Sequence, residues 1–216
     1  MTIDGPEGIG LPLGLADRDL GPVSLHLAPG SHALIAGPPR SGRTTTLVRL
    51  AVDAAGRVPT YWISPPSSTA PSLPTAVRVL PTVAGAVPAG AFTPEHLTAG
   101  PVLVLVDDAE RIDAEDPVLV GLVSSRNPGV HVVAACRNDR ARTQFGHWTR
   151  EVRAHGTGLL LNPDLDLDGD LLGVRLPRRP MVDLVVGRGW LTGPDQDVSG
   201  FVQVAMPPVD ENGSFM

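Results

Sequence analysis

Short apolar runs separated by turns dominate the pattern of this chain and predict most of its elements. Pro101-Val-Leu-Val-Leu-Val106 is the most hydrophobic run and is typical of a central parallel strand buried on both faces. Other strand-like runs lie at 23–27, 32–36, 59–63, 130–136 and 158–161, and helical spacing appears at 44–55, 114–125 and 140–153. Because strands and helices alternate, we expect an α/β domain with a central, mostly parallel sheet, helices on both faces and a closing hairpin near 188–205.

The remaining segments carry weaker patterns. Residues 1–10 are Gly-rich and are expected to form a flexible N-terminus, and residues 207–216 a flexible tail, which leaves one domain at 11–206. The segment 65–92 is rich in Pro, Ser, Ala and Gly and is predicted to be mostly loop, with an edge strand at 77–80. Thr93 and Pro94 have the residue types of an N-cap and a first helical position, so a short helix is expected there.

The chemistry concentrates first at Gly37-Pro-Pro-Arg-Ser-Gly42-Arg43-Thr44, directly after the apolar run that ends at Ala36. This segment has the spacing of a P-loop, in which backbone N–H groups at a helix N-terminus surround phosphate, and the next run begins at helical spacing. Arginine stands where the motif has lysine. The predicted nucleotide-binding residues are Gly37, Pro38, Pro39, Arg40, Ser41, Gly42, Arg43, Thr44 and Thr45.

Asp107 and Asp108 follow the central run at 101–106, where a P-loop ATPase carries its second acidic motif. Ligands bind at the carboxyl ends of strands in open α/β sheets, so Asp107 and the Thr44 hydroxyl are predicted to hold Mg²⁺. The alternative is that the two aspartates cap the following helix.

Hydrolysis needs a group that orients the attacking water and a group that neutralises phosphate charge. Asp108 and Arg43 are the candidates for catalytic residues, but both depart from the common pattern. Asp108 is one methylene shorter than the usual glutamate, and a planar guanidinium does not replace a compact ammonium. We therefore expect weak or absent intrinsic hydrolysis. In the empty site, the Arg43 guanidinium is expected to lie against Asp107 or Asp108.

Arg137 and Asn138, just after the run at 130–136, are candidates for a sensor pair that contacts the γ-phosphate. A solvated loop is an equally good interpretation of this pair. Trp62, Trp148 and Trp190 are expected to pack in the core rather than to stack on a ligand.

The composition argues against several other classes of protein. The formal net charge is −6, all 17 basic residues are arginines and none forms a basic stripe, so a DNA-binding surface is not expected. The single cysteine, Cys136, excludes a disulfide within the chain. No apolar run approaches the ~20 residues that span a bilayer, so membrane insertion is not expected. The simplest interpretation is a cytoplasmic domain.

Several motifs beyond the P-loop make the chain resemble the FtsK/SpoIIIE translocase family, and in particular the C-terminal ATPase module of EccC-type proteins of type VII secretion. They are Leu11–Asp17, Gly37–Thr45, Val104–Asp108, Val130–Val133, His147–Arg150, Gly158–Pro163, Gly169–Gly173, Leu176–Arg179, Gly187–Trp190 and Val202–Ala205.

This resemblance implies a RecA-like P-loop NTPase that binds ATP and Mg²⁺. It also implies sister ATPase modules or further copies of the chain as partners, and a place at the membrane within a larger assembly. Terminal EccC modules are often degenerate and bind export signals, which agrees with the altered motifs here. Two hypotheses follow: an ATP-binding motor module that depends on its neighbours, or a docking module for a helical secretion signal or a sister module. A DNA translocase motor module is the remaining alternative.

Overall fold

The computed structural model describes residues 4–5, 8–68, 71–93, 95, 97, 100–177, 185–193 and 198–208. The strands are β1 (Asp4–Gly5), β2 (Gly8–Ala16), β3 (Pro22–Leu27), β4 (Ala33–Ala36), β5 (Thr60–Ser64), β6 (Val77–Pro81), β7 (Val102–Val106), β8 (Val130–Cys136), β9 (Gly158–Leu161), β10 (Arg188–Thr192) and β11 (Val198–Val204). The helices are α1 (Arg43–Ala54), α3 (Pro117–Ser124), α4 (Asn138–Thr143) and α5 (Thr149–Ala154), with 3-10 turns η1 (Ala109–Arg111) and η2 (Asp168–Leu171).

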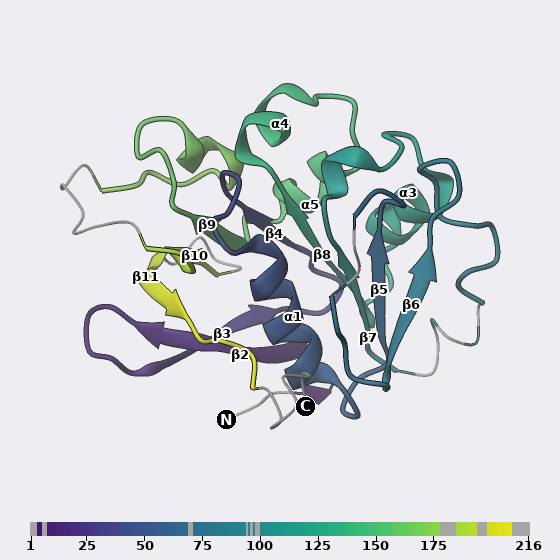
Figure 1. The fold of residues 1–216 in the computed structure, drawn as a ribbon, viewed down its shortest axis with the longest axis horizontal. Helices are drawn as coiled ribbons and strands as arrows, with labels where there is room; N and C mark the ends of the chain where they lie inside the picture. The colour runs from purple at the N-terminus through teal and green to yellow at the C-terminus, as the bar shows by residue number, and fades with distance from the viewer. Residues whose placement is uncertain are drawn as a thin grey trace.

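Within the described residues, all strands join one sheet in the order β1-β2-β11-β10-β9-β4-β8-β7-β5-β6, and β3 pairs with β2 (Figure 1). The neighbours from β9 to β6 run parallel, and the other pairs are antiparallel. The P-loop strand β4 therefore lies inside the parallel part, beside β8 and β9. The predicted α/β fold with a mostly parallel sheet is confirmed.

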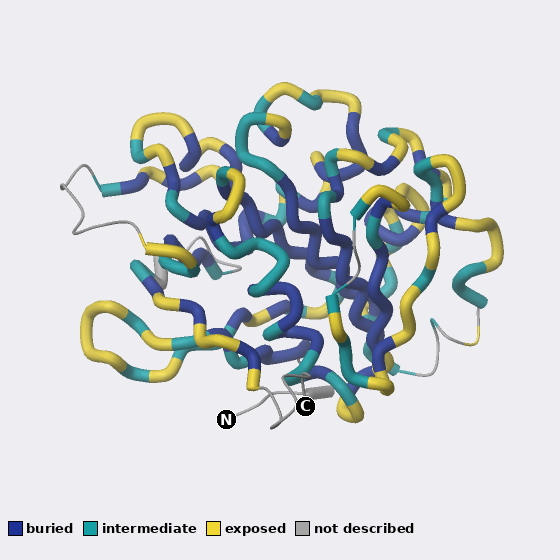
Figure 2. Tube along the Cα trace, in the orientation of Figure 1, coloured by how far each residue is buried: buried dark blue, intermediate teal, exposed yellow. Residues whose placement is uncertain are grey.

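Helices cover both faces of the parallel part, because successive side chains of each strand point to opposite faces. On one face, Ile35 and Leu105 pack with Leu47 and Leu50 of α1. On the other face, Leu34 and Val104 belong to a second cluster that includes residues of α3, α4 and α5. Figure 2 shows these central strands as buried and the surrounding loops as mostly exposed. The three tryptophans are buried, as expected.

The sheet begins earlier in the chain than the sequence indicates. Gly8, Ile9 and Gly10 lie in β2 and are buried, although residues 1–10 were expected to form a flexible segment. Gly8 has φ 106°, and a Cβ there would lie 2.1 Å from the carbonyl oxygen of Leu27. Glycine is therefore needed where β2 approaches β3 closely, which explains a glycine within a strand.

The predicted helix at 140–153 is wrong in its extent, because two short helices occupy the region. Gly146 lies between them, and His147 Nδ1 accepts the backbone N–H of Thr149, the first residue of α5, at 3.2 Å. His147 Nε2 contacts the carbonyl oxygen of Ile112 at 3.2 Å. The non-helical residues around Gly146, which has low helix propensity, thus divide one periodic stretch into two helices.

The helix predicted at 114–125 begins later, at Pro117. Asp116 is its N-cap, and Asp116 Oδ1 accepts the backbone N–H groups of Val118 and Leu119 at 3.0 and 2.8 Å. The helix expected at Thr93 falls largely on residues outside the described ranges.

Candidate functional site: a P-loop at the carboxyl edge of the sheet

The loop from Gly37 to Gly42 joins β4 to the N-terminus of α1, where the predicted phosphate cradle belongs. Arg40 and Gly42 have positive φ values of 65° and 103°, so the chain reverses sharply before the helix. A Cβ at Gly37 would lie 2.5 Å from Ser41 Oγ and 2.9 Å from the carbonyl oxygen of Leu161. The backbone is thus packed too closely at Gly37 for any side chain.

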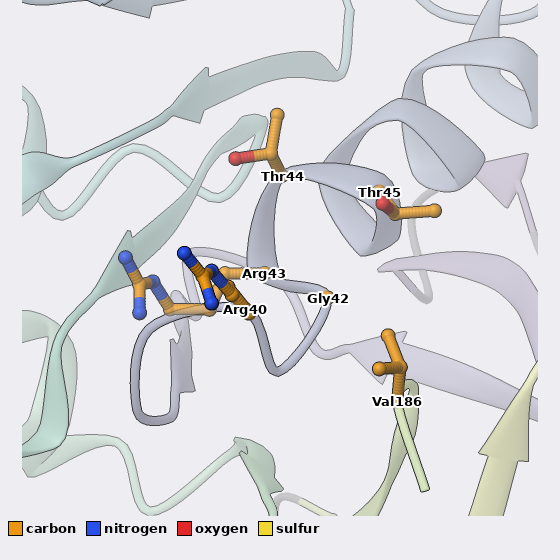
Figure 3. A pocket seen from close by; sticks show the side chains of 6 residues that line it. All are labelled: Arg40, Gly42, Arg43, Thr44, Thr45 and Val186. Atoms are coloured by element: carbon orange, nitrogen blue, oxygen red, sulfur yellow. The ribbon is translucent and has the colours of Figure 1, made fainter.

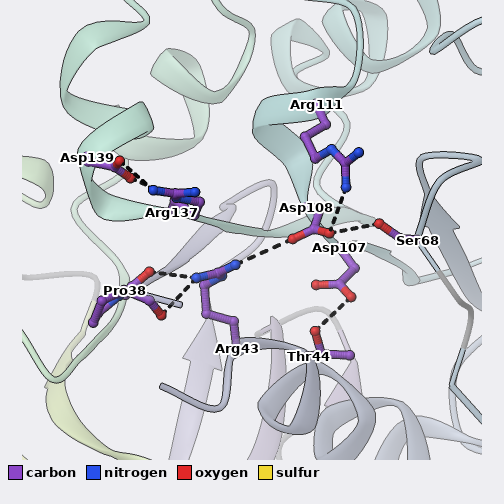
Figure 4. A network of polar contacts seen from close by, with 10 residues as sticks. Pro38, Arg43, Thr44, Ser68, Asp107, Asp108, Arg111, Arg137 and Asp139 are labelled. Carbon is purple, nitrogen blue, oxygen red and sulfur yellow. Dashed lines mark hydrogen bonds and ion pairs between the residues drawn. The ribbon is translucent and has the colours of Figure 1, made fainter. Parts of the chain in front are cut away.

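Thr44 and Asp107 come together at the first turn of α1. Thr44 Oγ1 donates a hydrogen bond of 2.9 Å to Asp107 Oδ2 (Figure 4). Asp107 directly follows β7 and is buried, and its Oδ1 has no hydrogen-bond partner. Burial raises the pKa of Asp107, and the Thr44 hydrogen bond partly offsets that increase. A buried carboxylate oxygen without a partner, next to a hydroxyl, fits a cation such as Mg²⁺.

Arg43 folds back onto its own loop. Its Nη1 donates to the carbonyl oxygens of Gly37 and Pro38 at 2.7 and 2.9 Å. Its Nη2 donates to Asp108 Oδ1 at 3.4 Å, and the side chain is 12% exposed. The expected contact between Arg43 and an acid of the cradle is therefore confirmed, with Asp108 as the partner. The contacts to the loop carbonyls were not expected from the sequence.

Asp108 is engaged on both carboxylate oxygens. While Oδ1 contacts Arg43, Oδ2 accepts from Ser68 Oγ at 2.7 Å and lies 3.8 Å from Arg111 Nη1 (Figure 4). The residue has φ 44° and ψ 45°, in the left-handed region that few non-glycine residues occupy. Asp108 links the P-loop side to the segment after β5, and its catalytic role stays a prediction.

The two sensor candidates, Arg137 and Asn138, have acidic partners. Arg137 contacts Asp139 through Nε and Nη2 at 3.0 and 2.8 Å (Figure 4). Asn138 Nδ2 donates to Asp168 Oδ2 at 2.8 Å, which holds the start of α4 against η2. A contact of either residue with phosphate stays a prediction.

Glu110 is a residue of this edge that the sequence did not indicate. Burial raises the pKa of Glu110, and its Oε2 is buried with no hydrogen-bond partner. The charges of Arg43 and Asp108 both act on it, as does the backbone of Arg137. Glu110 lies three residues after Asp107, in the 3-10 turn η1. The direction of its side chain therefore depends on local geometry that no motif encodes.

A cavity of about 230 Å³ lies outside the loop, lined by Arg40, Gly42, Arg43, Thr44, Thr45 and Val186 (Figure 3). Every nucleotide-binding candidate except Gly37, Pro38, Pro39 and Ser41 lines it. Gly187 N donates to the carbonyl oxygen of Ser41 at 2.9 Å, so the segment before β10 forms one wall. Pockets for drug-sized ligands are usually ~300–1,000 Å³, and this cavity is smaller.

Other site types find less support. Among the described residues, no group of three His, Cys, Asp or Glu side chains is placed to hold a metal ion. Mg²⁺ bound with nucleotide needs only one or two carboxylates, since waters and phosphates complete its shell. Cys136 is buried, and burial raises its pKa to about 12, so it is not a nucleophile. No described helix has the length and apolarity to cross a bilayer.

Several solved structures share the fold of this chain. Thermomonospora curvata EccC, ATPases 2 and 3 in complex with a signal sequence peptide, matches with a TM-score of 0.65 and 18% identity over 94% of this chain and 41% of that one. The fold is that of the EccC ATPase domains. EssC, ATPases 2 and 3, from Geobacillus thermodenitrificans matches with a TM-score of 0.62 and 14% identity over 93% and 41%.

A further chain, described as an ATPase, matches with a TM-score of 0.61 and 21% identity over 94% of this chain and 89% of that one. No protein-family model and no curated protein sequence matches the chain. The chain spans less than half the length of these EccC and EssC chains, each of which contains two ATPase domains.

Proposed function

We propose that this chain is an ATP-binding module of the type VII secretion ATPase kind, with weak or absent hydrolysis of its own. The observation that carries the proposal is the Thr44–Asp107 hydrogen bond of 2.9 Å beside the P-loop. In this proposal the backbone N–H groups from Gly37 to Thr45 bind the phosphates, and Thr44 and Asp107 hold Mg²⁺. The bound metal neutralises phosphate charge.

Weak hydrolysis follows from the positions of the two altered residues. The Arg43 guanidinium is hydrogen-bonded to the carbonyl oxygens of Gly37 and Pro38, so phosphate competes with these contacts for the same donors. Asp108 uses both oxygens in contacts with protein side chains, which leaves it poorly placed to orient a water molecule. Both effects act against turnover and leave the backbone cradle intact.

The partners proposed for the module are sister ATPase modules or further copies of the chain, and the signal peptide of a secreted protein. The EccC structure with a signal sequence peptide supports this setting. The alternative is a docking module in which the nucleotide fold serves only to bind a peptide or a sister module. A helical signal peptide needs an apolar groove, and the candidates for its walls are the segment 65–92 and the hairpin around Trp190 and Phe201. Trp190 is buried, with its ring 4.6 Å from that of Phe201, so the segment 65–92 is the stronger candidate.

Isothermal titration of the whole chain with Mg-ATP tests the proposal. We expect saturable binding that weakens at least tenfold in Thr44→Val, because the variant removes the hydroxyl paired with Asp107. Thr143→Val is the matched control, since Thr143 is exposed on α4. Absence of binding to the parent chain would leave only the docking function.

A second experiment separates the partner classes. Binding is compared between duplex DNA at near-physiological salt and a helical export-signal peptide from the same host. DNA affinity rests on clustered Lys and Arg, which a chain of net charge −6 without a basic stripe does not offer. Tight DNA binding with no peptide binding would support a DNA translocase motor module instead.

A further inference from the structure

The cavity at the P-loop has two chemically different ends. Arg40 and Arg43 lie together on one side of Gly42, whereas Val186 lies on the other side, facing Thr45 (Figure 3). One end therefore carries positive charge and the other is apolar. Val186 comes from a segment more than 140 residues away in sequence, so no motif of the loop predicts it.

The segment that carries Val186 is fixed to the P-loop. Gly187 N donates to the carbonyl oxygen of Ser41 at 2.9 Å, and Val204 N donates to the carbonyl oxygen of Gly187 at 2.8 Å. Gln203 Nε2 donates to the carbonyl oxygen of Val186 at 3.1 Å. These backbone and side-chain hydrogen bonds thus fix the position of Val186 next to the P-loop.

The Val186 side chain is largely exposed. Because the residue is 63% exposed, burial in the core does not account for its place beside the loop. A Cβ at Gly42, whose φ is 103°, would lie 3.3 Å from Val186 Cγ1, so the Val186 side chain lies close against the loop at Gly42. An apolar group continuous with a phosphate cradle suits the flat face of a nucleobase.

We propose that Val186 is the nucleobase contact of this site, so that the phosphates bind at the arginine end and the base lies on Val186 across from Thr45. This inference rests on the proposed nucleotide binding. None of the described residues that line the cavity carries an amide or carboxylate side chain, and the amide nitrogen of the neighbouring Gln203 donates to the carbonyl oxygen of Val186. ATP and GTP should therefore bind with dissociation constants within about threefold of each other, because an apolar contact does not distinguish an amino group from a carbonyl.

The test uses the whole chain and three ligands: Mg-ATP, Mg-GTP and inorganic tripolyphosphate with Mg²⁺, which has no base. Val186→Ser removes a few tens of Å² of apolar contact, and we expect it to weaken ATP and GTP binding about fivefold while tripolyphosphate binding stays the same. Val185→Ser is the matched control, because Val185 is also exposed but does not line the cavity. Since both positions are exposed, neither variant is expected to unfold the chain.

The outcomes separate the two proposals. If ATP and tripolyphosphate bind but Val186→Ser changes neither affinity, or changes both equally, the base contact is overturned and nucleotide binding stands. If ATP binds more than tenfold tighter than GTP, the apolar contact is overturned as the determinant of base choice. If neither ATP nor tripolyphosphate binds the parent chain, nucleotide binding itself fails and the base contact fails with it.

Discussion

Acidification should destabilise the domain through His32, which is buried at the start of the P-loop strand. His32 Nδ1 accepts the backbone N–H of Val132 at 3.2 Å, and its Nε2 lies 3.2 Å from the carbonyl oxygen of Val123. The neutral ring with its proton on Nε2 satisfies both contacts. A second proton on Nδ1 would face the N–H of Val132, so the charged form has no acceptor on that side.

The size of the effect follows from the pKa. Burial, and then the charge of His155, lower the pKa of His32 from 6.5 to about 4. The folded state therefore binds fewer protons than the unfolded state between these values, so stability is complete above pH 6.5 and falls as the pH decreases towards 4. Between pH 7.5 and pH 5, His32 alone should contribute a loss of about 2 kcal/mol in the free energy of unfolding.

Urea unfolding at pH 7.5 and pH 5 measures this loss. In His32→Asn the amide oxygen is placed to accept the N–H of Val132 without titrating. The variant should be less stable at pH 7.5, with a change between the two pH values about 2 kcal/mol smaller than in the parent. His26→Asn, at an exposed position of β3, is the control. A full-sized pH dependence in His32→Asn would refute the reasoning. The buried carboxylates Asp107 and Glu110 are common to both proteins, as are His131, His147 and His155, whose pKa values burial also lowers, so their contributions cancel in the comparison.

Three further variants test the P-loop edge. Arg43→Lys combined with Asp108→Glu should raise ATP affinity or turnover over the parent, measured by titration and phosphate release; no gain in either would mean that other residues block the cradle. Asp107→Asn should increase the urea midpoint at pH 7.5, because burial raises the pKa of Asp107 and so disfavours its charged form. The same variant should lose at least tenfold in Mg-ATP affinity, and an unchanged affinity would argue against its metal role. Gly37→Ala should reduce stability by about 1–3 kcal/mol in thermal or urea unfolding, since its Cβ would lie 2.5 Å from Ser41 Oγ; a neutral result would mean that the loop relaxes freely.

The sequence predicts those parts of the fold and site that depend on residue type at a fixed spacing. The run at 101–106 is a central strand because a strand covered on both faces is the kind of secondary structure that buries five consecutive aliphatic residues. The Thr44–Asp107 contact follows from two motifs that must meet at the carboxyl edge of a parallel sheet. The parallel order of the strands places the end of β4 near the end of β7, and so brings Thr44 and Asp107 together.

Other features depend on local geometry that periodicity does not encode. The break around Gly146 separates two helices that the periodic pattern had merged, and Gly8 lies in a strand where composition indicated a loop. Val186 reaches the P-loop only because a distant segment bonds to Ser41. Arg43 turns to the carbonyl oxygens of its own loop, a choice among several acceptors that its position in the motif leaves open.

The pairing of β2 with β11 has a consequence for how the domain forms during synthesis. Leu15 pairs with Gln203 and Ala16 with Val202, so strands near the two ends of the chain depend on one another. Contacts between such distant residues slow folding, because a long loop must close before they form. The pairing of β2 with β11 therefore cannot form until β11 has left the ribosome. Until then β2 lacks this neighbour, and its unpaired edge is a site at which the nascent chain can associate with other strands.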